Sequence, residues 1–215
     1  PLSYRYVTAQ PPEALTEQIL FDRPILLTEL AVTPATTIAI INVHLRAPLA
    51  AAVKGQKLAP FTWATTSGWA EGFFVASLKR NAQALEIRLA IDQMLDADPH
   101  RLIAVAGDLN AEDGEVPLKL LLAAEGDTGN GDLEARSLIL TERSIPEDRR
   151  FSVLHHGYAQ MLDHILVSRG LLGHFKSVEV HSETLADEGV GATFVSHAAG
   201  SYQAPMVADF AIEGA

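Results

Sequence analysis

The chain has 215 residues and carries 16 Lys and Arg against 27 Asp and Glu, which gives a formal net charge of −11. Hydrophobic residues make up 48% and charged residues 20%, a globular composition that excludes a disordered chain. No apolar run approaches the roughly 18 residues of a membrane span. The excess of acids disfavours non-specific binding to duplex nucleic acid, which depends on Lys and Arg.

The absence of cysteine excludes disulfides, thiolate metal sites and a cysteine nucleophile. The first residues, Pro-Leu-Ser-Tyr, contain no initiator Met and no signal peptide. We therefore expect a soluble fragment or processed chain, and the sequence does not indicate its localisation. Because there is no repeat and no clear linker, we expect one domain over residues 1–215.

Two buried strands are predicted first along the chain. Residues 24–32 and 37–44 are short, β-branched and mostly apolar, which is typical of strands covered on both faces. Pro34 lies between them and favours a hairpin connection.

A helix and a third buried strand follow. Apolar residues recur at three- and four-residue spacing from Lys79 to about Asp98, with Arg88 and Asp92 on the opposite side, so one stripe packs onto a sheet. Pro99 ends this helix. Residues 102–106 form the third strand. A second helix begins near Asp113, has Pro117 in its first turn and covers residues 118–124.

The last third of the chain is predicted to be a polar, turn-rich segment followed by three strands. The segment covers residues 126–150, and the strands cover residues 160–167, 177–181 and 205–212. Because strands outnumber helices and helices interrupt them, we expect a layered α/β protein with helices outside.

An irregular segment from Phe61 to Phe74 contains both tryptophans and three phenylalanines. It fits an aromatic lid over a site that contacts a base, a ring or a lipid chain. It also fits a satellite hydrophobic cluster that packs a crossover segment onto the sheet.

Three polar clusters follow apolar strands. Asn42 and His44 share one side of their strand, as do Asp108 and Asn110, while Asp163-His164 interrupts an apolar run. A buried carboxylate needs a cation or donors to compensate it. Carboxylate and amide oxygens suit Mg²⁺ or Mn²⁺, and histidine suits acid–base work or phosphate binding.

Each cluster also has a purely structural interpretation. A single Asp or Asn at a strand end is most often a turn or cap residue, and Asp163-His164 could be a structural ion pair. Arg23 and Arg80 are weaker candidates, because exposed arginines are common.

The three motifs also carry a family resemblance. Asn42-Val43-His44-Leu45, Gly107-Asp108-Leu109-Asn110-Ala111 and Leu162-Asp163-His164-Ile165 resemble, in order and spacing, motifs of the endonuclease/exonuclease/phosphatase family. The resemblance covers residues 23–212. It implies a four-layer α-β-β-α sandwich with mixed, largely antiparallel sheets and the site at one end of the two sheets.

The resemblance also implies roles for single residues. His44 looks like the histidine that contacts the scissile phosphate, and Asp108 like the carboxylate that orients or deprotonates water. Asn110 would hold phosphate or metal, and Asp163 would support the phosphate-binding histidine or a second metal position. Mg²⁺, or Mn²⁺, would be the cofactor, with Asp108, Asn110 and Asp163 as its ligands. The phosphate- or substrate-binding residues would be Asn42, Arg46, Arg80, His164, Tyr202 and Gln203.

The sequence departs from the family pattern in two places. Family members begin with an Asn strand and a strand ending in Gln-Glu, whose Glu is the main metal ligand. Thr16-Glu17-Gln18 has the reverse order, and Glu29 lies mid-strand. We therefore expect the chain to lack the family's first strands and this ligand, leaving a sheet edge that a second copy could pair with.

The second departure concerns the closing Ser-Asp-His motif of the family. Here Tyr202 and Gln203 replace the Asp and His, so the expected general-base dyad is absent. His197, or the pair His155-His156, could enter the site instead, although a loop histidine is more often solvated.

The sequence thus predicts a metal-dependent phosphoesterase-family domain that hydrolyses a phosphodiester or small phosphate ester weakly or not at all. The alternative is a non-catalytic module that binds a phosphorylated ligand or a protein partner on the same fold.

Overall fold

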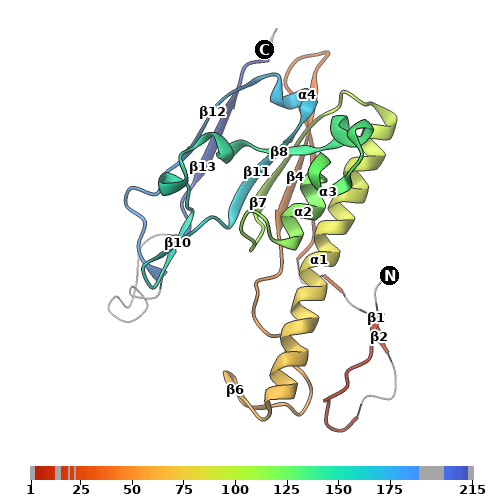
Figure 1. Cartoon of the computed structure of the whole chain (residues 1–215), viewed down its shortest axis with the longest axis vertical. Helices are drawn as coiled ribbons and strands as arrows, with labels where there is room; N and C mark the ends of the chain where they lie inside the picture. Colours follow the sequence, from red (N-terminus) through yellow and green to blue (C-terminus); the bar gives the residue numbers. More distant parts are fainter. Residues whose placement is uncertain (1–2, 13–15, 19, 22, 189–200, 213–215) are drawn as a thin grey trace.

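The computed structural model describes residues 3–12, 16–18, 20–21, 23–188 and 201–212. Its centre is a five-stranded sheet in the order β3-β4-β7-β11-β8 (Figure 1). Within it, only β4 and β7 pair in parallel, and the other neighbours pair antiparallel. The strands are β3 Leu26–Ala31, β4 Thr37–His44, β7 Leu102–Asp108, β8 Leu138–Leu140 and β11 Asp163–Ser168.

Smaller strand pairs and helices surround this sheet. The remaining strands are β1 Ser3–Tyr4, β2 Glu17–Gln18, β5 Lys57–Ala59, β6 Thr62–Trp63, β9 Val153–His155, β10 Tyr158–Gln160, β12 Phe175–Val180 and β13 Met206–Phe210. The α-helices are α1 Thr66–Ala97, α2 Val116–Leu122, α3 Glu125–Thr128 and α4 Arg169–Leu172. Short 3-10 helices cover Gly131–Arg136, Thr141–Ser144 and Glu147–Arg149.

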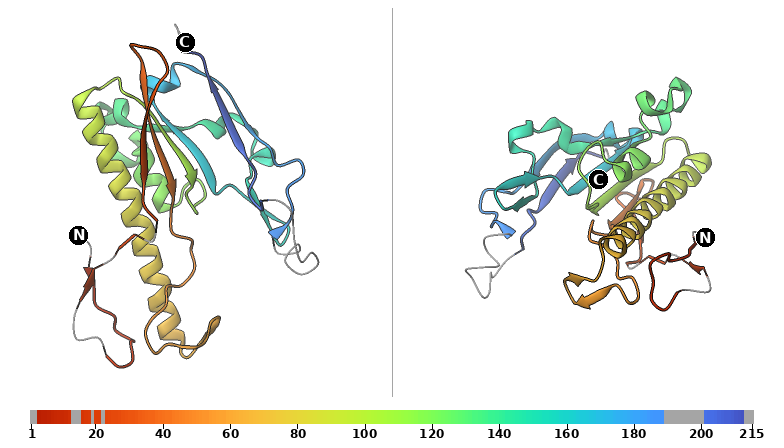
Figure 2. Two further views of the ribbon diagram at one scale, coloured as in Figure 1. Left: turned by 180° about the vertical axis from the view of Figure 1, so that it is seen from behind. Right: turned by 60° about the horizontal axis from the view of Figure 1, so that its bottom comes forward.

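Two hydrophobic clusters lie on opposite faces of the sheet. Alternate residues of β4, Ala39, Ile41 and Val43, pack with α1 and α2 on one face. Their neighbours Ile38 and Ile40 face the other side, where Phe210 of β13 joins them. Figure 2 shows α1 and the β12–β13 pair on opposite sides of the sheet. This mixed, mostly antiparallel α/β architecture confirms the predicted fold class.

Strand β3 departs from the sequence prediction. Residues 26–31 form a strand that pairs antiparallel with β4, as predicted, but all six residues are exposed. The apolar run therefore does not mark a strand covered on both faces, because β3 is the edge of its sheet and neither face is covered. The dimer expected at such an edge stays a prediction.

Helix α1 is longer and less simply patterned than predicted. It begins at Thr66, so most of the aromatic segment is helical, and it spans 32 residues, or about 48 Å. The eight-residue strand β4 reaches only about 26 Å, so the first turns of α1 extend beyond the sheet. Arg88 is also not on the solvent side. It is 6% exposed and donates to the carbonyls of Leu121 and Arg136.

Strand β8 lies in the segment that the sequence predicts to be turn-rich. It has only three residues, Leu138–Leu140, but it pairs with β11 and both of its leucines are buried. A strand this short carries too little alternation to stand out from turns. Among the described residues, no helix has the length and apolar content needed to cross a bilayer.

Candidate active site

Three neighbouring strands bring the predicted polar residues into one row. His44 at the end of β4 is the register partner of Asp108 on β7, and Asp108 is the partner of Asp163 on β11. Directly opposed residues in a sheet share a face, so all three side chains project toward the β12–β13 side. The three motifs, far apart in sequence, therefore form one cluster, which we call the strand-end cluster: His44, Asp108, Asn110, Asp163 and Gln203.

Asp108 is the centre of this cluster. One carboxylate oxygen, Oδ1, accepts from the backbone N–H of Asn110 at 2.8 Å. The other, Oδ2, accepts from Gln203 Nε2 at 2.7 Å and lies 3.4 Å from His44 Nε2. Its side chain is 9% exposed, whereas that of His44 is 45% exposed. His44 thus presents an imidazole to solvent beside a largely buried carboxylate.

The turn after β7 explains why its motif has this composition. Gly107 has φ +138°, and a Cβ there would lie 2.0 Å from the Val43 carbonyl oxygen, so only glycine fits. Asn110 has φ +49°, a left-handed conformation that asparagine tolerates. Its Nδ2 donates to the Leu45 carbonyl at 3.0 Å, which ties the turn to the end of β4.

Asp163 is the carboxylate with an unused oxygen. Its Oδ2 is buried and has no hydrogen-bond partner among the described residues. Burial raises the pKa of Asp163, a hydrogen bond from Ser152 opposes this, and the charge of Asp108 raises it further. A buried, unpaired carboxylate oxygen beside a second carboxylate is costly, and a proton or a cation relieves that cost.

His164 is turned away from the strand-end cluster. Adjacent strand residues face opposite sides, so its ring enters the helix-side core, where it is 1% exposed. Its Nδ1 lies 2.6 Å from Glu142 Oε1 and its Nε2 lies 2.8 Å from the Ala111 carbonyl oxygen. Burial alone would lower the pKa of His164, but the hydrogen bond and charge of Glu142 raise it. The ring is fully partnered, so we leave it out of the proposed site.

Two arginines, Arg80 and Arg46, lie beside the cluster. Arg80, on α1, donates to the Asn110 carbonyl and lies 4.0 Å from Glu115 Oε2. Arg46 donates its backbone N–H to Gln83 Oε1 at 2.9 Å, and it lines a pocket with Arg23 and His44. Asn42 donates to the Ala106 carbonyl at 3.3 Å.

The C-terminal segment brings the replaced motif to the site. Gln203 forms a bridge with Val153, and the Ala204 N–H donates to the Ser152 carbonyl at 2.8 Å. Tyr202 and Gln203 line one pocket with Asn110, and Gln203 and Asp163 line a neighbouring one. Tyr202 therefore lies beside the strand-end cluster, and Gln203 donates to Asp108.

The proposed histidines His155 and His156 lie at the β9–β10 hairpin, next to the pocket of Tyr202 and Gln203, which Glu188 also lines. His155 pairs with Glu188 at 3.4 Å at the β9–β10 hairpin, where its ring packs edge-on against that of His156. His197 lies outside the described residues. Glu29 pairs with Arg101 on the exposed edge, away from the cluster.

Sequence reasoning missed Ser152 and Gln83. Ser152 is 0% exposed, and its hydroxyl accepts from the backbone N–H groups of Leu162 and Asp163, both at 3.1 Å. It therefore fixes the start of β11 and the position of the Asp163 carboxylate. Gln83 could have been found as a polar residue on the sheet-facing side of the predicted helix, whereas a loop serine gives no such signal.

The oxygen atoms around Asp108 and Asp163 decide whether the site can hold a metal ion. In the described ranges, no group of three or more His, Asp or Glu side chains comes together to hold an ion. The unpartnered Asp163 oxygen beside Asp108 nevertheless suits a cation, and Asn110 adds an amide oxygen donor nearby. The residues fit a divalent ion with few charged ligands, and few ligands imply weak binding.

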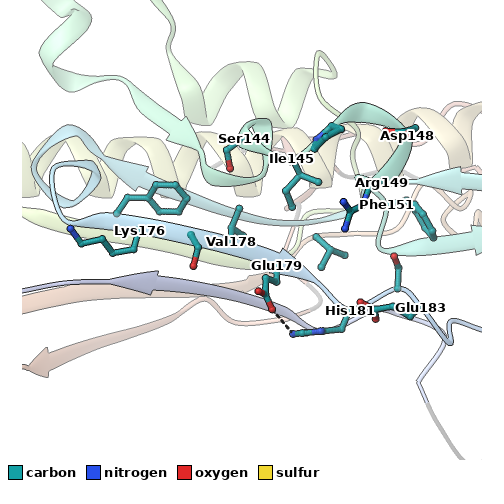
Figure 3. Close-up of a pocket in the computed structure, with 15 residues that line it drawn as sticks. Ser144, Ile145, Asp148, Arg149, Phe151, Lys176, Val178, Glu179, His181 and Glu183 are labelled. Atoms are coloured by element: carbon teal, nitrogen blue, oxygen red, sulfur yellow. Dashed lines mark ion pairs between the residues drawn. The ribbon is translucent and has the colours of Figure 1, made fainter.

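A separate pocket lies on the outer side of β12 (Figure 3). It is lined by residues of the 144–151 segment and of β12, and His181 pairs with Glu179 there at 3.7 Å. None of the residues of the strand-end cluster lines it. We therefore do not assign the predicted chemistry to this pocket.

The described fold is the deoxyribonuclease I-like fold. It is similar to the 3′ phosphatase NExo from Neisseria bound to product DNA hairpin, at 17% identity and TM-score 0.52, over 98% of this chain and 70% of that one. It is also similar to the 3′–5′ exonuclease NExo from Neisseria meningitidis, at 18% identity and TM-score 0.50, over 97% and 70% of the two chains. No family model and no curated protein matches the sequence.

Proposed function

We propose that the strand-end cluster binds a phosphoester and hydrolyses it slowly by in-line attack of water. The observation that carries this proposal is the register that aligns His44, Asp108 and Asp163 across three strands. The backbone N–H of Asn110, in the turn after β7, and the side chain of Gln203, from the C-terminal segment, both donate to the central carboxylate. The same fold in the nuclease and phosphatase NExo supports a phosphoester as the substrate class.

Each residue has a role that follows from its position. Asp108 orients the attacking water and takes its proton as the new P–O bond forms. His44, the exposed partner, donates a hydrogen bond or a proton to the phosphoryl or leaving oxygen as the old P–O bond breaks. Asn110 and Gln203 supply neutral amide groups for hydrogen bonds to the phosphate.

A divalent ion held by Asp163, Asp108 and Asn110 would stabilise negative charge on the phosphoryl oxygens. Slow turnover follows from two features of this chain. Gln203 does not titrate, so it cannot replace an imidazole base, and the loss of a general base typically costs about 10²–10⁴-fold in rate. The cation also has few charged ligands, as described above.

One turnover experiment distinguishes hydrolysis from the alternative, a non-catalytic binding module. Turnover of bis-p-nitrophenyl phosphate is measured with Mg²⁺ and with Mn²⁺ for the wild type, Asp108→Asn and Asp113→Asn. Asp113 is the matched control, because this acid pairs with Arg143 outside the cluster. We expect slow turnover that Asp108→Asn lowers by about 10²-fold or more and that Asp113→Asn retains. Turnover that is absent, or equal in all three proteins, contradicts the proposal.

A further inference from the structure

The end of the molecule beyond the sheet carries a group of apolar side chains that are exposed, apart from the half-buried Trp63. We call it the aromatic tip and define it as Leu58, Phe61, Trp63, Trp69 and Phe73. Phe61, in the β5–β6 turn, is 96% exposed, Leu58 is 74% exposed and Trp69 is 48% exposed. Trp69 stacks on Phe73, and Trp63 and Trp69 line one pocket. Contiguous exposed apolar groups of this kind mark an interaction surface.

Hydrogen bonds and close packing at the start of α1 hold the aromatic tip in place. Thr65 caps α1 by accepting from the Gly68 N–H at 2.9 Å, and its hydroxyl donates to the buried Gln56 at 2.6 Å. Gly72 lets the chain at Ala51 approach the helix, because a Cβ there would lie 2.3 Å from the Ala51 carbonyl oxygen. The exposure is therefore a property of a packed hairpin and helix.

The buried Glu71 ties a further segment to the start of α1. Its carboxylate accepts from the Tyr4 hydroxyl at 3.0 Å, from the Thr8 N–H at 2.7 Å and from the Val7 N–H. Burial raises the pKa of Glu71, but these hydrogen bonds outweigh it and lower the pKa. These hydrogen bonds thus compensate the negative charge of Glu71 inside the protein.

The charge around the aromatic tip is opposite to that of the whole chain. The protein has 27 acids and a net charge of −11, yet residues 31–70 contain no Asp or Glu. The same stretch contains Arg46, Lys54 and Lys57. Lys57 Nζ lies 3.9 Å from the centre of the Trp63 ring. The tip thus combines exposed aromatic groups with the charge of Lys57, in a stretch of sequence that contains no Asp or Glu.

We propose that the aromatic tip docks on an anionic lipid bilayer. Tryptophan and phenylalanine beside lysine are the groups that enter the interface between headgroups and acyl chains. Each basic residue near such a surface adds about 1 kcal/mol of attraction. A single-stranded nucleic acid fits less well, because Leu58 offers no stacking surface, Trp69 and Phe73 stack on each other, and few cations are present to neutralise phosphates.

The position of the aromatic tip would bring the strand-end cluster to the same surface. The chain leaves β4 at His44 and runs alongside α1 to the β5–β6 hairpin, so the tip lies beyond the site end of the sheet (Figure 1). Leu49, 71% exposed, lines the pocket that His44 shares with Arg46. Docking does not depend on the proposed hydrolysis, and binding and turnover are tested separately.

The two tryptophans report on the aromatic tip alone, because the chain contains no others. Tryptophan emission and co-sedimentation are measured with phosphatidylcholine vesicles, with and without roughly one-third phosphatidylserine. We expect a blue shift, quenching by brominated acyl chains and co-sedimentation with the anionic vesicles. Phe61→Ser should weaken binding about tenfold, since it removes one aromatic side chain that the bilayer would bury. Tyr158→Ser, at a site 76% exposed on the other hairpin, should change it less than twofold.

Four results would overturn docking on lipid. The emission and the sedimentation could be unaffected by anionic vesicles, or the two serine variants could weaken binding equally. A thymidine oligonucleotide could quench the tryptophans while vesicles do not, which would assign the surface to nucleic acid. A blue shift that grows with protein concentration in the absence of lipid would assign it to a second copy of this chain.

Discussion

The two faces of strand β11 place neighbouring titratable residues in opposite situations. Asp163 faces the strand-end cluster with one buried oxygen that has no partner among the described residues, while His164 faces the helix-side core with both ring nitrogens partnered. Each side chain interrupts the same apolar run in the sequence. The difference teaches that a buried polar residue points to chemistry when its hydrogen-bonding capacity is incomplete, and to structure when it is complete.

The largest expected effect is on the structural face. Glu142→Gln should destabilise the protein by about 3 kcal/mol at pH 6, because it leaves a buried imidazolium without its counter-charge. The free energy of unfolding in urea measures this. Glu134→Gln is the matched control, because the Glu134–Arg169 pair is largely exposed and should contribute less than about 1 kcal/mol. Equal losses for the two variants would mean that His164 is not held by its partner.

The same pair predicts how stability depends on pH. Because Glu142 raises the pKa of His164 in the fold, its stabilisation is complete below the ordinary histidine pKa of about 6.5. The stabilisation is lost as the pH rises through the higher folded value. The urea midpoint of the wild type should therefore fall as the pH rises through this window. Glu142→Gln should remove most of that slope, and an unchanged slope would assign it to other groups.

Substitution on the functional face should change stability in the opposite direction, although the pH dependence has the same sign. The raised pKa of Asp163 means that the fold disfavours its charge, so stability falls as the pH rises from the ordinary aspartate value of about 3.9. Asp163→Asn should therefore raise the urea midpoint at pH 7 and leave it unchanged at acid pH.

Asp113→Asn is the control for this sign. Arg143 lowers the pKa of Asp113, so this variant should lose stability at pH 7. If Asp163→Asn also lost stability at pH 7, the carboxylate would be a well-compensated structural group, and the contrast between the two faces of β11 would disappear.

The sequence predicted much of the sheet and most members of the strand-end cluster. Apolar runs located the three strands, with polar residues at the ends of β4 and β7 and at the start of β11. The parallel β4–β7 and antiparallel β7–β11 pairing then brings those polar residues together. The residues of the motif Gly107-Asp108-Leu109-Asn110 are specified by the turn that they form, so local composition was sufficient.

What could not be predicted depends on tertiary environment. The apolar composition of β3 does not reveal whether anything covers it, and the strand is an exposed edge. The sequence around His164 does not show whether its side chain contacts a phosphate or Glu142, and in the structure it contacts Glu142. Ser152 reaches Asp163 through a loop, and no periodic pattern marks such a contact. Arg88 was assigned to solvent by its charge, although backbone carbonyls satisfy it in the interior.

The most direct test of the central claim is to restore the replaced dyad. Tyr202→Asp together with Gln203→His puts a titratable imidazole where Gln203 now donates to Asp108. If the strand-end cluster is an otherwise intact phosphoesterase site, the initial rate with bis-p-nitrophenyl phosphate and Mg²⁺ should rise about 10²-fold, and Asp108→Asn should abolish the gain. A folded double variant with no gain in rate would contradict this account.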